Sequence, residues 1–133
     1  MPRYNKNNIK ELKEFLYNSC VHDATLKNII YDYSNGNIRI ELLNLIFNVK
    51  INLTFLDIEI ALTVKGEWSE NRETIISLTA EEEFSYLENY LIKHGEYMGD
   101  SLYMLFQMFS GDELHIVAQE VLIEIITEQR KQL

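Results

Sequence analysis

The sequence predicts an α+β domain: a mainly antiparallel β-sheet of about six to eight strands in a meander, an N-terminal helix, and a second helix near 80–94. Apolar residues recur at helical spacing before residue 20. The stretch 25–66 is rich in Ile, Val, Thr, Phe and Tyr and contains no Pro. With 133 residues, 47% of them hydrophobic and 25% charged, the chain suits a single globular domain spanning 1–133.

The first helix is expected at about 8–19. Asn8-x-x-Glu11 approximates a capping box, in which each of the two side chains accepts a hydrogen bond from the other residue's backbone N–H. The residues of the apolar face are Ile9, Leu12, Leu16 and Cys20. Their spacing predicts a short amphipathic helix that packs one side against the sheet.

A β-hairpin is expected around Asn35-Gly36. This pair separates two strand-like runs, and both residue types tolerate the positive φ angles of a type I′ turn. After the turn, Ile38, Ile40 and Leu42 alternate with polar residues. Such alternation indicates a strand with one buried face and one solvated face.

Two further strand segments, 49–55 and 56–64, alternate in opposite phase. The phase changes at Phe55-Leu56. A shift of one residue exchanges the two faces of a strand, so we expect a bulge or a tight turn at this point.

One more strand is expected at 74–78, followed by the second helix. Thr79-x-x-Glu82 is a capping box, and acidic residues in the first turn stabilise a helix because they lie at the positive end of its dipole. Gly95 is a natural residue to end the helix. The apolar face consists of Phe84, Leu87 and Leu91.

Residues 113–127 fit either a helix or a strand. Ser110-x-x-Glu113 is a capping box, and apolar residues follow it at helical spacing. The same residues also alternate with one slip, and Val, Ile and Thr dominate 116–127. We expect strands, with SGDE as the turn of a hairpin.

The charge of the chain is uneven. The net charge is −9, and residues 66–128 carry two basic residues against fourteen acidic ones, a balance of −12. This field repels phosphate backbones, so nucleic-acid binding is not expected. It favours a basic protein partner or a cation, although a solvated acidic surface is the simpler interpretation. The acidic and aromatic residues that could form a partner-binding surface are Glu67, Trp68, Glu70, Glu73, Glu81, Glu82 and Glu83.

The chain has eight tyrosines, and this number is compatible with a homodimer interface. Tyr and Trp are enriched at protein interfaces, and a Tyr-rich face or a sheet edge could join two copies. Half-buried tyrosines within a sheet are the simpler interpretation.

The sequence indicates no cofactor, metal or membrane. No window reaches the roughly 18 apolar residues of a membrane helix. The N-terminal residues lack a signal-like apolar run, and the single Cys suits a reducing compartment, so we expect a cytoplasmic protein. Glycine-rich phosphate-binding motifs, His-Glu-x-x-His and paired Cys-x-x-Cys are absent. His22, His94 and His115 do not have the spacing of metal ligands.

The segment CVHDA (20–24) holds the residue types of a nucleophile, a base and an orienting group in Cys20, His22 and Asp23. Residues two apart on a strand are separated by nearly 7 Å at about 3.3 Å per residue, and on a helix they diverge. Catalysis would therefore need a tight turn. The alternative is a structural corner, in which His22 and Asp23 bond backbone groups at the helix end and Cys20 packs beneath them.

The stretch VHDATLKNIIYDYSNGNIRIEL resembles the opening of a group of small bacterial domains, in which a short helix, a His-Asp-Ser/Ala motif and a β-hairpin follow one another. Leu53-Thr54-Phe55 and FSGDELHIVAQEVLIEI are similar to later strands of these domains. The resemblance covers most of the chain and implies a sheet-rich fold, but no catalytic residues. Some members are similar to immunity proteins of bacterial toxin systems. The helix predicted at 80–94 is a departure from the group.

Two functions are compatible with the sequence. The first is a non-enzymatic cytoplasmic interaction module that binds a basic partner through an acidic surface, with an immunity-like role as the form that the resemblance implies. The alternative is a small hydrolase or ligand-binding protein with its site around Cys20, His22 and Asp23. The absence of a complete catalytic motif favours the first.

Overall fold

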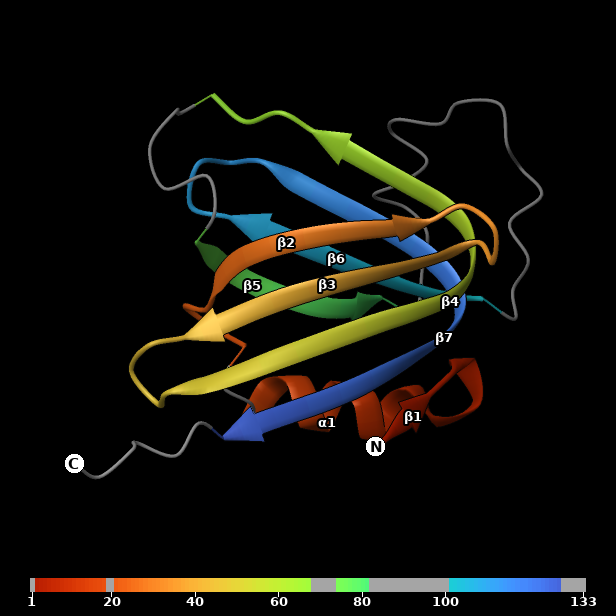
Figure 1. Ribbon diagram of the computed structural model, residues 1–133, viewed down its shortest axis with the longest axis horizontal. Coiled ribbons are helices and arrows are strands. Elements are labelled where there is room, and N and C mark those ends of the chain that lie inside the picture. The colour runs from red at the N-terminus through yellow and green to blue at the C-terminus, as the bar shows by residue number, and fades with distance from the viewer. Residues whose placement is uncertain (1, 19–20, 68–73, 82–100, 128–133) are drawn as a thin grey trace.

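The computed structural model describes residues 2–18, 21–67, 74–81 and 101–127, which contain a seven-stranded antiparallel sheet and one α-helix (Figure 1). This confirms the predicted α+β class. The elements in chain order are β1 (Arg3–Tyr4), the 3-10 helix η1 (Lys6–Asn8), α1 (Ile9–Asn18), β2 (Thr25–Asp32), β3 (Asn37–Asn44), β4 (Val49–Val64), β5 (Ile75–Glu81), β6 (Leu102–Met108) and β7 (Glu113–Thr127).

The strands lie in the order β2-β3-β4-β7-β6-β5, and β1 pairs with β7. The predicted meander holds within β2–β4 and within β5–β7, but β4 lies beside β7 rather than β5. This arrangement of β4 to β7 is a Greek key. It gives β6 two paired neighbours, and most residues of β6 are buried on both faces. An interior position suits a strand as apolar as LYMLFQM.

The sheet curls until its two ends meet at one point. Thr25 of β2 forms an antiparallel bridge with Thr74, just before β5. Beside this bridge, the Ile75 N–H donates to the Ala24 carbonyl at 2.9 Å, and the Asp23 N–H donates to the Ile75 carbonyl at 3.0 Å. The last residue of the α1–β2 connection is thereby fixed to the start of β5.

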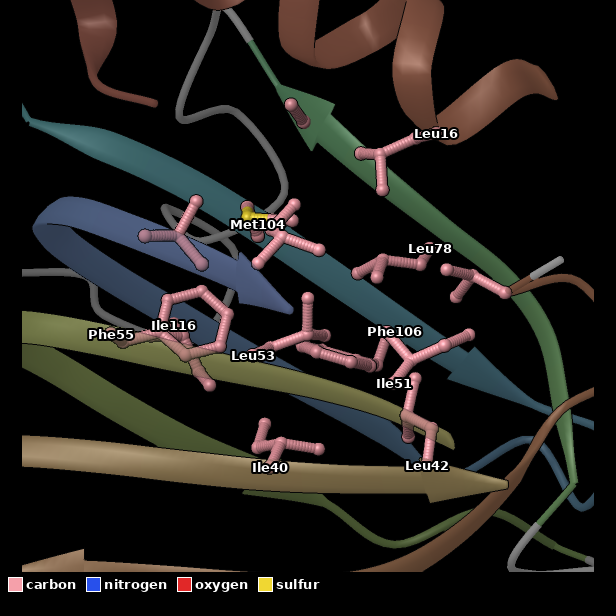
Figure 2. Close-up of a cluster of buried hydrophobic side chains, with 14 of the residues drawn as sticks. Leu16, Ile40, Leu42, Ile51, Leu53, Phe55, Leu78, Met104, Phe106 and Ile116 are labelled. Atoms are coloured by element: carbon pink, nitrogen blue, oxygen red, sulfur yellow. The ribbon is translucent and has the colours of Figure 1, made fainter. Parts of the chain in front are cut away.

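The main core fills the inside of this curl (Figure 2). Side chains of β3, β4, β5, β6 and β7 point into it, and Leu12 and Leu16 of α1 are buried against it. Phe55 and Phe106 meet edge to face, with ring centroids 6.2 Å apart. The buried residues Tyr103, Leu105 and Val117 form a second, smaller cluster, against which Ile60 packs.

The N-terminal helix predicted at about 8–19 is confirmed by α1 at Ile9–Asn18, but the predicted cap is wrong. Asn5, not Asn8, is the capping residue, and it caps η1. The Asn7 N–H donates to Asn5 Oδ1 at 2.8 Å, and the Asn5 N–H donates to Asn8 Oδ1 at 2.7 Å. Asn8 is thus the second member of a capping box that begins one turn earlier.

The β2–β3 hairpin lies where Asn35-Gly36 predicted it, but its turn is not type I′. Four residues, 33–36, connect the paired ends Asp32 and Asn37, and among them Gly36 alone has a positive φ, 65°. A type I turn closed by a left-handed glycine is a common solution for such longer hairpin loops.

The change of phase at Phe55-Leu56 corresponds to an irregularity inside one long strand, not to a tight turn. β4 runs for 16 residues, Asp57 has a φ of 54°, and the register against β7 shifts between Ile58 and Ile60. On the two sides of this register shift, Ile58 packs against the main core and Ile60 against the smaller cluster.

The capping box predicted at Thr79 is wrong. Thr79 and Glu81 belong to β5, where they stand opposite Leu105 and Tyr103 of β6. Pairing with an interior strand overrides the local helix signal. The rest of the predicted second helix, 82–94, lies outside the described residues. The strand interpretation of 113–127 is confirmed by β7, and Ser110, Gly111 and Asp112 of SGDE lie in the β6–β7 turn, with Glu113 as the first residue of β7.

Candidate functional site

His22 and Asp23 lie in the turn that joins α1 to β2. His22 Nδ1 lies 3.1 Å from Asp23 Oδ2, and their side chains are 64% and 49% exposed. Asp23 has a φ of 66°. Backbone hydrogen bonds hold the corner, among them the bond from the Ala24 N–H to the Val21 carbonyl at 3.0 Å. An exposed pair of this kind contributes little to stability, but a carboxylate beside an imidazole can orient a base. Cys20 lies outside the described residues.

A cavity of about 480 Å³ lies between α1, this corner and β5. Leu16, Val21, Leu78 and Ala80 supply apolar side chains to its wall, and His22 and Glu81 are among its polar residues. The fold therefore brings together two residues that the sequence placed in separate candidate sites. Their position on one cavity depends on the meeting of β2 with the start of β5, which no local pattern in the sequence indicates.

The predicted acidic surface is described at two of its residues, Glu67 and Glu81. Glu67 is exposed and follows Gly66, whose N–H donates to Asp112 Oδ1 in the β6–β7 turn. Glu81 is partly buried, stands opposite Tyr103 near the other end of β6, and accepts a bond from Thr79 Oγ1 at 2.8 Å. The structure does not place these two together. Trp68, Glu70, Glu73, Glu82 and Glu83 lie outside the described residues.

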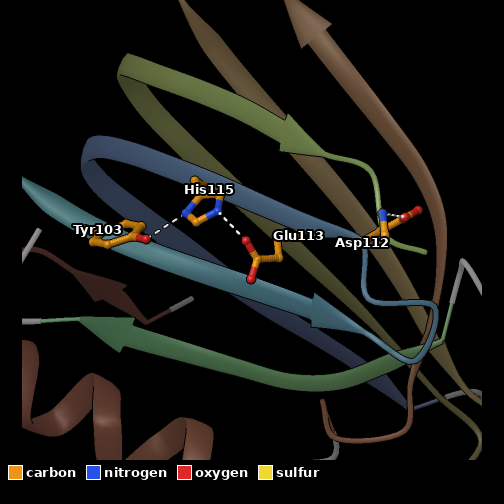
Figure 3. Close-up of polar contacts among 5 residues, drawn as sticks. Tyr103, Asp112, Glu113 and His115 are labelled. Atoms are coloured by element: carbon orange, nitrogen blue, oxygen red, sulfur yellow. Dashed lines mark hydrogen bonds and ion pairs between the residues drawn. The ribbon is translucent and has the colours of Figure 1, made fainter. Parts of the chain in front are cut away.

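Tyr103, His115 and Glu113 form a series of polar contacts across β6 and β7 that runs from the buried interior to a partly exposed carboxylate (Figure 3). The Tyr103 hydroxyl lies 2.6 Å from His115 Nδ1, and His115 Nε2 lies 3.1 Å from Glu113 Oε1. An ionised carboxylate can only accept, so Nε2 carries a proton. In the neutral ring Nδ1 is then the acceptor, and the tyrosine donates to it. Tyr103 and His115 are fully buried, whereas the Glu113 side chain is 20% exposed, so the bond between Tyr103 and His115 satisfies polar groups beneath the surface.

The β3–β4 hairpin ends in an exposed apolar loop that sequence reasoning did not identify. Leu45, Ile46 and Phe47 are 73%, 77% and 65% exposed. We call these three residues the apolar tip. Their run of apolar letters looks like a continuation of the strands on either side, although Asn44 and Asn48, residues typical of turns, flank it.

Hydrogen bonds to the Asn44 side chain and a left-handed residue, Asn48, fix the backbone of the apolar tip. Asn44 is buried, and its Oδ1 accepts from the Ile46 N–H at 3.0 Å and from the Phe47 N–H at 3.2 Å. Asn48 closes the loop with a φ of 54°. An Asn side chain that bonds the next backbone groups forms a defined turn. The exposed side chains are therefore presented by an ordered loop.

Among the described residues, no three His, Cys, Asp or Glu side chains gather as a metal ion would require. No described helix has the length and apolar character needed to cross a membrane. A comparison with models of protein families found no match, and a comparison with curated proteins found none either.

Proposed function

We propose that this chain is a non-enzymatic protein-interaction module that inserts the apolar tip into a hydrophobic pocket of a basic partner protein. The observation that carries the proposal is the exposure of Leu45, Ile46 and Phe47 at the end of a hairpin whose backbone Asn44 holds in place. Burying three such side chains on a partner is favourable by roughly 1.5–3 kcal/mol each.

The defined backbone of the loop supports a role of the apolar tip in binding. Association loses less conformational freedom when the contact residues already hold their bound arrangement. Aromatic anchors that enter pockets dominate the energy of many interfaces, and Phe47 is the aromatic residue of the tip.

The net charge of −9 supports a basic partner. A field of that sign attracts a basic protein over a distance and speeds association, and salt weakens the effect. An immunity-like role, in which the partner is a bacterial toxin, is the specific form that the resemblance of VHDATLKNIIYDYSNGNIRIEL suggests. A toxin gene next to the gene of this protein would support that form.

Affinity capture with three forms of the protein tests the proposal. Phe47→Asp places a charge in the tip, and Tyr33→Asp places the same charge on an 85% exposed aromatic residue in the β2–β3 loop. We expect at least one protein to be retained by wild type and Tyr33→Asp, lost with Phe47→Asp, and retained less at high salt. Identical retention by all three forms, or retention by none, would contradict the proposal.

A second candidate function is favoured by the cavity that His22 lines. If the segment 20–23 is a small hydrolase site, His22 activates Cys20 as a nucleophile. Iodoacetamide should then label Cys20 faster in the folded protein than in the urea-unfolded chain, because a thiolate reacts faster than a thiol. His22→Ala should slow labelling of the folded form. Slower labelling of folded wild type than of the unfolded chain would exclude the nucleophile.

A further inference from the structure

β2 is an edge strand that carries exposed apolar side chains. One side of β2 pairs with β3, and in the described part of the chain its other side is bridged only at Thr25, by Thr74 just before β5. Beyond that bridge, Ile29, Ile30 and Tyr31 are 49%, 49% and 42% exposed. Edge strands that stay single are commonly protected by bulges, Pro or charged residues, since open backbone groups invite another strand.

The protection of β2 is confined to its beginning. The register shift lies between Leu26 and Asn28, and it includes the exposed Lys27. From Asn28 to Asp32 the pairing with β3 is regular, and this stretch contains neither Pro nor Lys. Ile30 is the centre of this regular edge.

We propose that the regular edge of β2 pairs antiparallel with β2 of a second copy of this chain, about a two-fold axis at Ile30. A two-fold axis perpendicular to a sheet keeps every side chain on its own face. Ile30 then stands opposite Ile30 of the partner subunit, Ile29 opposite Tyr31 of the partner subunit, and Asn28 opposite Asp32 of the partner subunit.

This register matches like with like on both faces. Ile29 and Tyr31 stand opposite the buried Ile40 and Ile38 of β3, so they lie on the core side of the sheet. Pairing Ile29 with Tyr31 of the partner subunit therefore extends each core across the junction. Cross-strand pairs of aromatic and β-branched residues are among the favourable ones.

The polar ends of the edge also match. Asn28 Nδ2 donates to Glu41 Oε1 at 2.9 Å, and Asp32 Oδ2 accepts from Asn35 Nδ2 at 2.7 Å. An amide nitrogen has two protons and a carboxylate has two oxygens, so each group keeps capacity for a bond across the dimer. Moving the axis to Ile29 would set Asn28 against isoleucine, and moving it to Tyr31 would set Asp32 against isoleucine.

Charge favours a second copy over a basic partner at this edge. The hairpin of β2 and β3 carries two basic residues, Lys27 and Arg39, and two acidic ones, Asp32 and Glu41. Two neutral hairpins meet without net repulsion, although the whole chain is acidic. The proposal concerns a surface other than the apolar tip and does not depend on the proposed function.

Disulfide trapping tests the register in a Cys20→Ser background. Directly paired residues have Cα atoms about 4.5–5.5 Å apart, which is within disulfide range. Ile30→Cys should therefore yield a covalent dimer under mild oxidation. Asn28→Cys alone should not, because its own copy lies about 13 Å away along the strands, whereas a mixture of Asn28→Cys and Asp32→Cys should cross-link. Equal cross-linking at every position, or none at Ile30→Cys, overturns the proposal.

Sedimentation equilibrium tests the association itself. Wild type should sediment with twice the chain mass, and Ile30→Lys with the mass of one chain, because the two lysines would face each other at the axis. Ile46→Lys, which changes the tip, should stay dimeric. Circular dichroism verifies that each variant is folded. Wild type that is monomeric at every concentration, or a dimer that survives Ile30→Lys in folded protein, contradicts the proposal.

Discussion

Gly66→Ala is expected to lower the free energy of unfolding by about 3 kcal/mol or more, or to prevent folding. Gly66 follows β4 and lies against the β6–β7 turn. A Cβ at this position would come closer than 3.0 Å to backbone atoms of Ser110, Gly111 and Asp112. Backbone cannot rotate away as a side chain can. The substitution would also disturb the bond from the Gly66 N–H to Asp112, which joins the end of β4 to the turn. Urea unfolding followed by circular dichroism measures the loss.

Gly36→Ala is the matched control. Gly36 has a φ of 65°, and nothing lies within 4 Å of the position of its Cβ. The expected cost is about 1 kcal/mol, from the left-handed conformation alone. Equal losses for the two variants would show that the close approach at Gly66 is not a constraint on folding.

Phe106→Ala is expected to lower the free energy of unfolding by about 3–5 kcal/mol, since it leaves a cavity in the centre of the main core. Phe106 is fully buried on β6 and meets Phe55 of β4 edge to face. The substitution removes the ring contact that Phe106 of β6 makes with Phe55 of β4 across the core. Urea unfolding at constant pH measures this effect.

Phe47→Ala provides the same change of side chain in the apolar tip. Phe47 is 65% exposed, and surface substitutions usually change stability by less than about 0.5 kcal/mol. A loss at Phe47 as large as the loss at Phe106 would mean that the tip packs into the fold. The contrast also identifies Phe47→Ala as a folded variant for binding experiments.

Much of the local structure could be predicted because strand patterns are short-range. Alternation along Ile38, Ile40 and Leu42 identified β3, and all three residues are buried. The opposite phases on either side of Phe55-Leu56 indicated the irregularity in β4. The same reasoning misassigned Thr79, because a capping box is a local signal and the pairing with β6 is not.

The arrangement of the strands could not be predicted in this way. β4 and β7 are separated by more than forty residues, yet their ladder runs from Val49 opposite Thr127 to Val64 opposite Glu113. The cavity that contains both His22 and Glu81 depends on the junction of β2 with β5. Polar residues at Tyr103 and His115 within apolar strands were a visible signal, but their contact follows from the β6–β7 register.

The apolar tip was missed for a different reason. Leu45, Ile46 and Phe47 have the composition of a strand, and the side chain of Asn44 directs the backbone into a turn instead. The two flanking asparagines were the available signal. The proposed function therefore depends on the exposure of the apolar tip, which the amino-acid composition of this segment does not indicate.

The dissociation constant of Phe47→Ala for the captured partner tests the proposed function most directly. Calorimetric titration should show an increase of about 30-fold or more over wild type, which corresponds to a hot-spot loss of about 2 kcal/mol. Tyr33→Ala, an exposed aromatic residue at the other hairpin loop, should stay within about twofold. A Phe47→Ala protein that is folded and binds within twofold of wild type would contradict the assignment of the tip as the binding site.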